Sequence, residues 1–268
     1  MPSHKNQQPT GIPSPRPPRG WHSRGYLRHF DGGAEQPQSV TFRLADSVPA
    51  QVIDQWLDEL QRNPTQERET EFRKRIQTFL DTGYGACHLH EARIGSLVEK
   101  ALLFFDAQRY RLHAWIVMPN HVHVLFTPEP RWSLSVILGS WKSYTANEAN
   151  KLLKRSGQFW QEDYFDRFIR DAEHFAHALD YIEMNPVKPG LCFQPEQWSF
   201  GSARYRASSV DVDAAKMAAV PVENLNPGTA AILAAGEHHQ SPMESIPTQP
   251  ITTACAAKMA AVPGKDQP

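Results

Sequence analysis

The sequence predicts an α+β protein, in which amphipathic helices accompany antiparallel strands. Three observations support this fold class. Residues 39–45 alternate between apolar and polar and are rich in residues that favour strands. Two apolar runs, at 109–118 and 121–127, flank a Pro119-Asn120 turn and predict a β-hairpin. Elsewhere, apolar residues recur at helical spacing in several long segments.

The first helical segments lie between the first strand and the hairpin. Residues 50–80 show helical periodicity that is interrupted at Asn63-Pro64, which predicts two helices. A third helix is expected around residues 94–105. This helical stretch occupies much of the first half of the chain.

Two more helices are expected after the hairpin. The first covers residues 133–153, with Ser133 as a candidate N-cap. Its apolar face is predicted to hold Leu134, Ile137, Leu138, Trp141 and Tyr144. Residues 157–169 are rich in aromatic side chains and are expected to be irregular. The last helix covers residues 172–184 and ends at Asn185-Pro186, because a residue before proline disfavours the α conformation.

Both ends of the chain differ from its centre in composition. Residues 1–20 contain six prolines and almost no apolar residue, so we expect a disordered arm. The basic residues of this arm are candidates for phosphate contacts, with a solvated tail as the alternative. Residues 207–268 are dominated by Ala, Val, Pro and Gly and contain the octapeptide Ala-Ala-Lys-Met-Ala-Ala-Val-Pro twice, which indicates a flexible tail of low complexity. One folded domain is therefore expected over residues 21–206.

Composition narrows the class of protein. The formal net charge of −1 over 268 residues argues against a general binder of polyanions, although it allows a local site. The sequence has three cysteines, which lie far apart and form no Cys-x-x-Cys motif. Neither a disulfide scaffold nor a cysteine-based zinc site is therefore indicated. No apolar run approaches the roughly 18 residues of a membrane span. A soluble protein of a reducing compartment, the cytoplasm, is expected.

The second strand of the hairpin carries His121 and His123, separated by one valine. Alternate residues of a strand point to the same face, so the two imidazoles are predicted to lie side by side. Such a pair supplies part of a metal site, but an isolated His-x-His more often faces solvent. A second pair, in His88-Leu89-His90, has no strand pattern around it, and we assign it no metal role.

The last helix carries Tyr181 and Asn185, which are four residues apart and so share one helical face. Taken alone, they are an ordinary tyrosine and an ordinary residue near a helix end. Combined with two histidines, they suggest a specific chemistry. Two imidazoles and an amide oxygen are neutral ligands that leave most of the charge of a divalent cation available to a phosphodiester. A tyrosine hydroxyl can form a covalent intermediate, provided that its proton, with an ordinary pKa of about 10, is removed.

These residues stand in motifs that resemble the single-tyrosine HUH transposases, and among them most closely the REP-associated tyrosine transposases. The resemblance is carried by Met118-Pro119-Asn120-His121-Val122-His123 and by residues 179–190. Further matching motifs, in the same order along the chain, occur at residues 141–145, 157–161, 167–171 and 198–203. The resemblance as a whole covers roughly residues 21–206.

The resemblance implies a ferredoxin-like core with a central antiparallel sheet flanked by helices. It implies that His121, His123 and Asn185 bind Mg²⁺ or Mn²⁺ and that Tyr181 is the nucleophile. The expected substrate is single-stranded DNA folded into hairpins of repetitive extragenic palindromes (REP), and the expected setting is the nucleoid. Cleavage and rejoining would pass through a 5′-phosphotyrosine. A monomer is expected, with a dimer that exchanges helices as the alternative.

The candidate DNA contacts combine basic and aromatic side chains, each with a solvated face or core packing as its alternative. They are Lys142, Trp160, Arg167, Arg170 and Lys188. Tyr164 is the strongest competitor of Tyr181 as nucleophile. Glu183, two residues after Tyr181, points elsewhere on the helix and receives no ligand role.

Two other functions compete with this interpretation. The protein could be a regulator that binds DNA hairpins without cutting them, although such a protein has no need of the histidine pair, the tyrosine and the amide together. A structural zinc site is disfavoured, because only two histidines and no nearby cysteine are present. The long helical stretch between Ala50 and Phe105 and the tail after Arg206 depart from the compact relatives.

Overall fold

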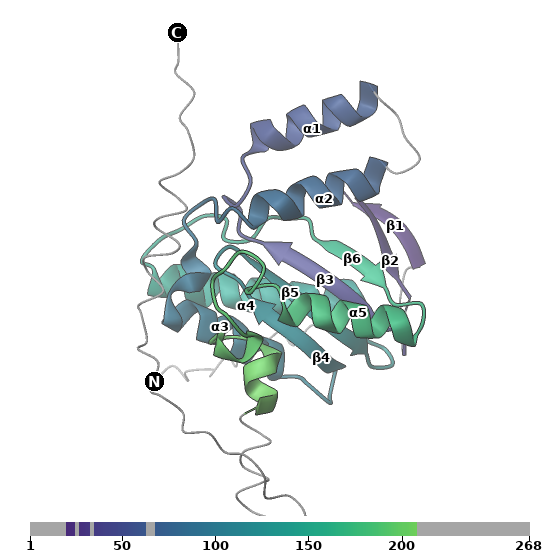
Figure 1. Ribbon diagram of the computed structural model, residues 1–268, viewed down its shortest axis with the longest axis vertical. Helices are drawn as coiled ribbons and strands as arrows, with labels where there is room; N and C mark the ends of the chain where they lie inside the picture. Colours follow the sequence, from purple (N-terminus) through teal and green to yellow (C-terminus); the bar gives the residue numbers. More distant parts are fainter. Residues whose placement is uncertain (1–19, 25–26, 33–34, 63–67, 208–268) are drawn as a thin grey trace, which may run out of the picture.

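The computed structural model describes most of the predicted domain (Figure 1), namely residues 20–24, 27–32, 35–62 and 68–207. Apart from Gly20 and Ala207, the predicted arm and tail lie outside the described residues, as does the predicted helix break at Asn63-Pro64. No helix in the described part of the chain is long and apolar enough to cross a membrane.

An antiparallel sheet forms the centre of the described region. Its strands are β3 (Gln38–Arg43), β4 (Tyr110–Val117), β5 (His121–Pro128) and β6 (Phe165–Phe168), in the spatial order β4-β5-β3-β6. Each neighbouring pair is antiparallel. Helices connect β3 to β4 and β5 to β6, so the strand order and the connections are those of a ferredoxin-like fold. The predicted fold class is confirmed.

β4 and β5 form the predicted hairpin. Across its turn, the N–H of Met118 donates to the carbonyl of His121 at 2.9 Å. The turn itself consists of Pro119 and Asn120, as the sequence indicated. β5 is buried along its whole length, which means that other elements cover both of its faces.

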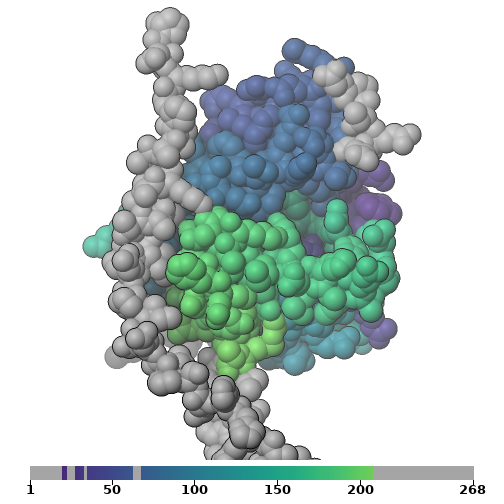
Figure 2. Space-filling view, viewed as in Figure 1, coloured from purple at the N-terminus to yellow at the C-terminus, as the bar shows by residue number. Residues whose placement is uncertain are grey.

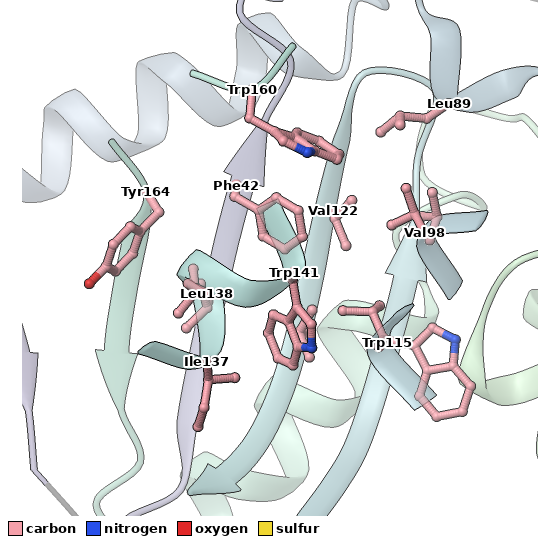
Figure 3. Packing of buried hydrophobic residues seen from close by; sticks show 14 of the residues in the cluster. Phe42, Leu89, Val98, Trp115, Val122, Ile137, Leu138, Trp141, Trp160 and Tyr164 are labelled. Atoms are coloured by element: carbon pink, nitrogen blue, oxygen red, sulfur yellow. The ribbon is translucent and has the colours of Figure 1, made fainter. Parts of the chain in front are cut away.

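The main hydrophobic core lies between the sheet and two helices, α3 (Ala92–Leu103) and α4 (Leu134–Leu152). Figure 3 shows Trp141 of α4 beside Phe42 of β3, with Trp160 in the same cluster. Truncating a buried aromatic side chain of this kind costs about 3–5 kcal/mol. This core fixes the strands on which the site is built.

The opposite face of the sheet is covered by α5 (Ala172–Glu183), which lies in front of β4 and β5 in Figure 1. Leu125 of β5 packs there with Ile182 of α5 in a second hydrophobic cluster. Since side chains alternate along a strand, His121 and His123 point to the same face as Leu125. β5 therefore presents both imidazoles to α5.

α4 follows Ser133, as predicted, but its capping contact comes from another residue. The hydroxyl of Ser133 makes no capping hydrogen bond within the described residues. The carboxylate of Asp31 instead accepts the N–H of Leu134 at 3.3 Å. A negative charge at a helix N-terminus is favourable, so Asp31 stabilises the start of α4.

The predicted place of Tyr144 in the apolar face of α4 is wrong. Its side chain is 55% exposed. Thr145 takes the inward position four residues after Trp141, and its hydroxyl donates to the carbonyl of Trp141 at 2.6 Å. Tyr144 consequently lies on the solvent side of the helix.

α1 (Ala50–Arg62) and α2 (Arg68–Leu80) form a pair of helices above the sheet in Figure 1, which confirms the two helices predicted for this stretch. Phe72 and Ile76 of α2 are buried in the cluster between them. Phe165 of β6 packs against the same cluster. The pair is thereby anchored to the edge of the sheet.

Three strands were not predicted. Two of them, β1 (Gly20–Arg24) and β2 (Leu27–Asp31), pair with each other, and the third, β6, lies in the segment expected to be irregular. A strand as short as β6 shows too few alternations for its period to be recognised. β6 is recruited by pairing with β3, a contact between distant parts of the chain.

A buried charged cluster fastens β2 to β6 and to the loop before it. The ring nitrogens of His29 lie 2.5 Å from a carboxylate oxygen of Asp166 and 3.2 Å from one of Asp163. Burial lowers the pKa of His29, but the hydrogen bonds to Asp163 and Asp166 and their charges outweigh burial and raise this pKa to about 9. The ring is therefore protonated at neutral pH.

We predict that this cluster makes the fold less stable as the pH rises above neutrality. Because the pKa of His29 is raised from 6.5 to about 9, its contribution is complete below pH 6.5 and is lost as the pH rises through 9. Over this range the free energy of unfolding, measured by urea denaturation, should fall by up to about 3 kcal/mol more in the wild type than in His29→Gln. Equal pH dependence in the two proteins would contradict this assignment.

Candidate active site

His121 and His123 lie at the start of β5, opposite Arg43 and Thr41 of β3. They are 1% and 2% exposed, so the alternative of two solvent-facing histidines is excluded. Their ring centroids are 4.8 Å apart and the ring planes are nearly perpendicular, at 88°. The strand thus holds two imidazoles side by side in a buried place.

Each imidazole is oriented through its Nδ1 atom. Nδ1 of His121 lies 2.7 Å from Oδ1 of Asn120, and because an amide oxygen only accepts, the ring donates and its Nε2 carries no proton. Nδ1 of His123 lies 2.6 Å from the hydroxyl oxygen of Thr41. Both Nε2 atoms are buried and have no hydrogen-bond partner among the described residues. Histidines that bind metals are commonly held in this way by an outer group.

The surroundings keep both histidines neutral. Burial, and then the neighbouring His123, hold the pKa of His121 well below its ordinary value of 6.5. Burial lowers the pKa of His123 to about 3, and the positive charge of Lys188 acts in the same direction. Neutral imidazoles are the form that binds a cation.

α5 brings Tyr181 to the histidine pair. The helix is capped at its start by the side chain of Asp171 and is seated on the sheet by Ile182, which is fully buried. The ring centroids of Tyr181 and His123 are 5.6 Å apart. Tyr181 is 36% exposed, so a substrate can reach it from solvent.

Asn185 stands where α5 ends, directly before Pro186. Its side chain is 2% exposed and acts on Tyr181 through a side-chain hydrogen bond, so the two residues are neighbours, as the spacing of four residues predicted. Its Oδ1 atom is buried and has no partner in the described part of the chain. The amide of Asn185 thus contacts Tyr181 and also places a buried acceptor atom in the site.

The phenol of Tyr181 is protonated at neutral pH. Burial raises its pKa to about 12, the charge of Asp81 adds to this effect, and the hydrogen bond from Asn185 opposes it. Nζ of Lys188 lies 4.0 Å from the centroid of the Tyr181 ring, in a cation–π contact. A positive charge is therefore held over the ring of the tyrosine whose hydroxyl would have to lose its proton.

The donor atoms of the site fit a divalent cation. Nε2 of His121, Nε2 of His123 and Oδ1 of Asn185 are neutral donors, and each is buried without a partner within the described residues. These residues could hold Mg²⁺ or Mn²⁺ and leave coordination positions to a phosphate. No group of three His, Cys, Asp or Glu residues gathers in the described ranges, so the structural zinc alternative gains no support.

Three of the candidate DNA-binding residues are exposed. Lys188 lies beside the tyrosine, whereas Arg167 belongs to β6 and Arg170 precedes α5. All three side chains can be approached by a phosphate backbone. Only Lys188 is placed directly at the site.

The other two candidates are engaged within the protein. Nζ of Lys142 donates to the carbonyls of Gln161 and Glu162 at 2.7 and 2.6 Å, which ties α4 to the following loop. Trp160 is 4% exposed, and its indole N–H donates to Thr145 at 2.9 Å. The structure therefore favours core packing over base stacking for Trp160.

The other residues considered at the sequence level make different contacts. The second His-x-His forms the 3₁₀ turn η1 (His88–His90), with Leu89 buried between the two histidines. Tyr164 is 5% exposed and its ring lies 4.4 Å from that of His29, between centroids. Glu183 accepts a hydrogen bond from Ser202 at 2.6 Å.

Sequence reasoning assigned no role to Asn120 or Thr41, which orient the two imidazoles. Asn120 stands directly before the first histidine, and this position was the one available signal. Its amide nitrogen also donates to the carbonyls of Leu80 at 3.2 Å and Tyr84 at 3.0 Å. Thr41 is brought to His123 by strand pairing, across 82 residues of sequence.

The part of the chain that holds the site is similar to proteins of a known class. Residues 89–185, which include the histidine pair, Tyr181 and Asn185, match the family described as "Transposase IS200 like". The matched region contains the candidate active site and is similar in sequence to this family. The chain is also similar to a REP-associated tyrosine transposase of Escherichia coli (strain K12), with 29% identity over 94 residues. The resemblance predicted from the motifs is confirmed.

The extent of these similarities is limited. The match with the E. coli protein covers 35% of this chain and 54% of that protein, so the chain aligns with about half the length of this relative. A solved structure of a REP-associated tyrosine transposase bound to a REP hairpin is similar over 70% of this chain and 86% of that chain, with 18% identity and a TM-score of 0.43.

Proposed function

We propose that this protein is a metal-dependent transposase-like enzyme that nicks and rejoins single-stranded DNA at REP hairpins. The observation that carries this proposal is the Tyr181 ring beside His123, together with buried donor atoms on His121, His123 and Asn185 that have no partners in the described region. A binding module needs no such combination.

The chemistry assigns one role to each group. The oxygen of Tyr181 attacks the scissile phosphorus, the bond between phosphorus and the 3′ oxygen breaks, and that oxygen takes up a proton. The products are a 5′-phosphotyrosine and a free 3′-OH. A bound Mg²⁺ or Mn²⁺, held by His121, His123 and Asn185, would polarise the non-bridging phosphate oxygens. Attack of a 3′-OH on the phosphotyrosine reverses the step, so neither water nor a nucleotide cofactor is consumed.

The residues around Tyr181 prepare this step. The hydrogen bond from Asn185 lowers the pKa of the phenol and thereby opposes the effect of burial. Lys188 holds a positive charge 4.0 Å from the ring centroid, where it can stabilise a phenolate and contact the DNA phosphate. Tyr181 lies beside His123 of its own chain, which supports a monomer that cleaves with its own tyrosine.

A labelled single-stranded hairpin from the REP-like repeats that flank the coding region tests the proposal. With Mg²⁺ or Mn²⁺, we expect a nick on one strand and a protein–DNA adduct that survives denaturation. Chelation by EDTA should abolish both products. Tight binding of the hairpin without nicking in any divalent metal would instead favour a regulator that binds and does not cut.

A further inference from the structure

The turn that ends α2 is connected to the candidate metal site. The amide nitrogen of Asn120 donates to the carbonyls of Leu80 and Tyr84, while its oxygen accepts from the ring of His121. One amide group thus joins the turn formed by residues 80–84 to an imidazole of the site. This turn cannot shift without disturbing the orientation of His121.

Asp81 stands in that turn and faces the site. It lines one hollow together with Asn120, His121 and, from the segment after α5, Pro189. Figure 2 shows the surface of α2, in blue, adjoining the green surface of α5 and the segment that follows it. The carboxylate therefore lies on the same side of the candidate site as the ring of His121.

We infer that Asp81 is a positioning residue of this site, which attracts the divalent cation and orders its water ligands from the α2 side; this rests on the proposed function. The residues named as ligands are neutral, so a nearby carboxylate contributes a negative charge that they lack. No third acidic or histidine group of the described residues joins His121 and His123 at ligand distance, which places Asp81 outside direct coordination. Outer groups of this kind strengthen metal binding.

Asp81 comes from the helical stretch that precedes the region matching the transposase family. It lies outside residues 89–185, which match the transposase family. Gln77 donates to its carboxylate at 2.8 Å, and the buried Ile76 and Leu80 fix the last turns of α2. The helical pair of α1 and α2 therefore has a function, namely to deliver a carboxylate to the site.

Calorimetric titration of the DNA-free full chain with Mn²⁺ alone tests this role. Asp81→Asn keeps the shape and the acceptor for Gln77 but removes the charge, and it should bind Mn²⁺ about tenfold more weakly than the wild type. Asp81→Glu, which keeps the charge, should bind more tightly than Asp81→Asn. Asp54→Asn, a matched change on the exposed side of α1, should bind as the wild type does.

The outcomes separate this inference from the function on which it rests. If Asp81→Asn binds Mn²⁺ as tightly as the wild type and His123→Ala does not bind it, the role of Asp81 is overturned. The proposed metal site is then unaffected. Equal weakening in Asp81→Asn and Asp81→Glu also overturns it, because the charge is then not the cause. Failure of the wild type to bind Mn²⁺ overturns both the inference and the proposed function.

Discussion

Tyr181→Phe should form no covalent DNA adduct and should retain less than about a thousandth of the wild-type nicking rate. The change removes only the phenolic oxygen, which is the atom proposed to attack phosphorus. The ring remains in place beside His123, and Lys188 can still lie over it. Hairpin affinity, measured by gel shift or fluorescence anisotropy, should therefore stay close to that of the wild type.

Two matched variants control for the loss of a tyrosine hydroxyl. Tyr144→Phe alters an exposed residue of α4, and Tyr164→Phe alters the buried competitor beside His29. Both should nick the hairpin as the wild type does. If the adduct persists in Tyr181→Phe and disappears in Tyr164→Phe, the nucleophile is Tyr164 and not Tyr181.

His123→Ala should weaken Mn²⁺ binding by more than about a hundredfold, beyond the usual effect of losing an outer group. It removes one of the two Nε2 atoms that have no partner in the described region. Nicking should fall with the metal affinity, and high Mn²⁺ concentrations should restore little of it, because the remaining donors form an incomplete site. Calorimetry with Mn²⁺ and the hairpin assay measure the two effects separately.

His113→Ala is the matched control for this change. His113 also bonds a threonine, with Nε2 2.7 Å from the hydroxyl of Thr127, but it belongs to β4. The control loses a similar His–Thr contact without losing a proposed ligand. Equal loss of Mn²⁺ binding in the two variants would show that His123 acts through stability, and the metal site would have to be placed elsewhere.

The elements with a strong local signal were predicted correctly. The β4–β5 hairpin was visible because Pro119 and Asn120 separate two apolar runs, and α5 was visible because Pro186 stops it. β1, β2 and β6 are short, and long-range pairing decides them. Tyr144 was misplaced because Thr145, a polar residue, is buried through its hydrogen bond to the helix backbone.

The candidate site was predicted as far as local spacing allows. Strand alternation placed His121 and His123 on one face, and the helical interval placed Tyr181 near Asn185. That Tyr181 lies beside the histidine pair depends on how α5 crosses the sheet. Local spacing does not reveal this, so the prediction came from the family resemblance. The roles of Asn120 and Asp81 depend on the contact between the β4–β5 turn and the end of α2, which no local pattern reveals.

The most direct test of the account is to locate the bond between protein and DNA. The wild-type adduct, formed with the REP-like hairpin and Mn²⁺, can be digested with nuclease and protease and sequenced by mass spectrometry. We predict a 5′-linked nucleotide on the peptide that contains Tyr181. A nucleotide on any other residue, or cleavage that leaves no protein-bound DNA, would contradict the proposed mechanism.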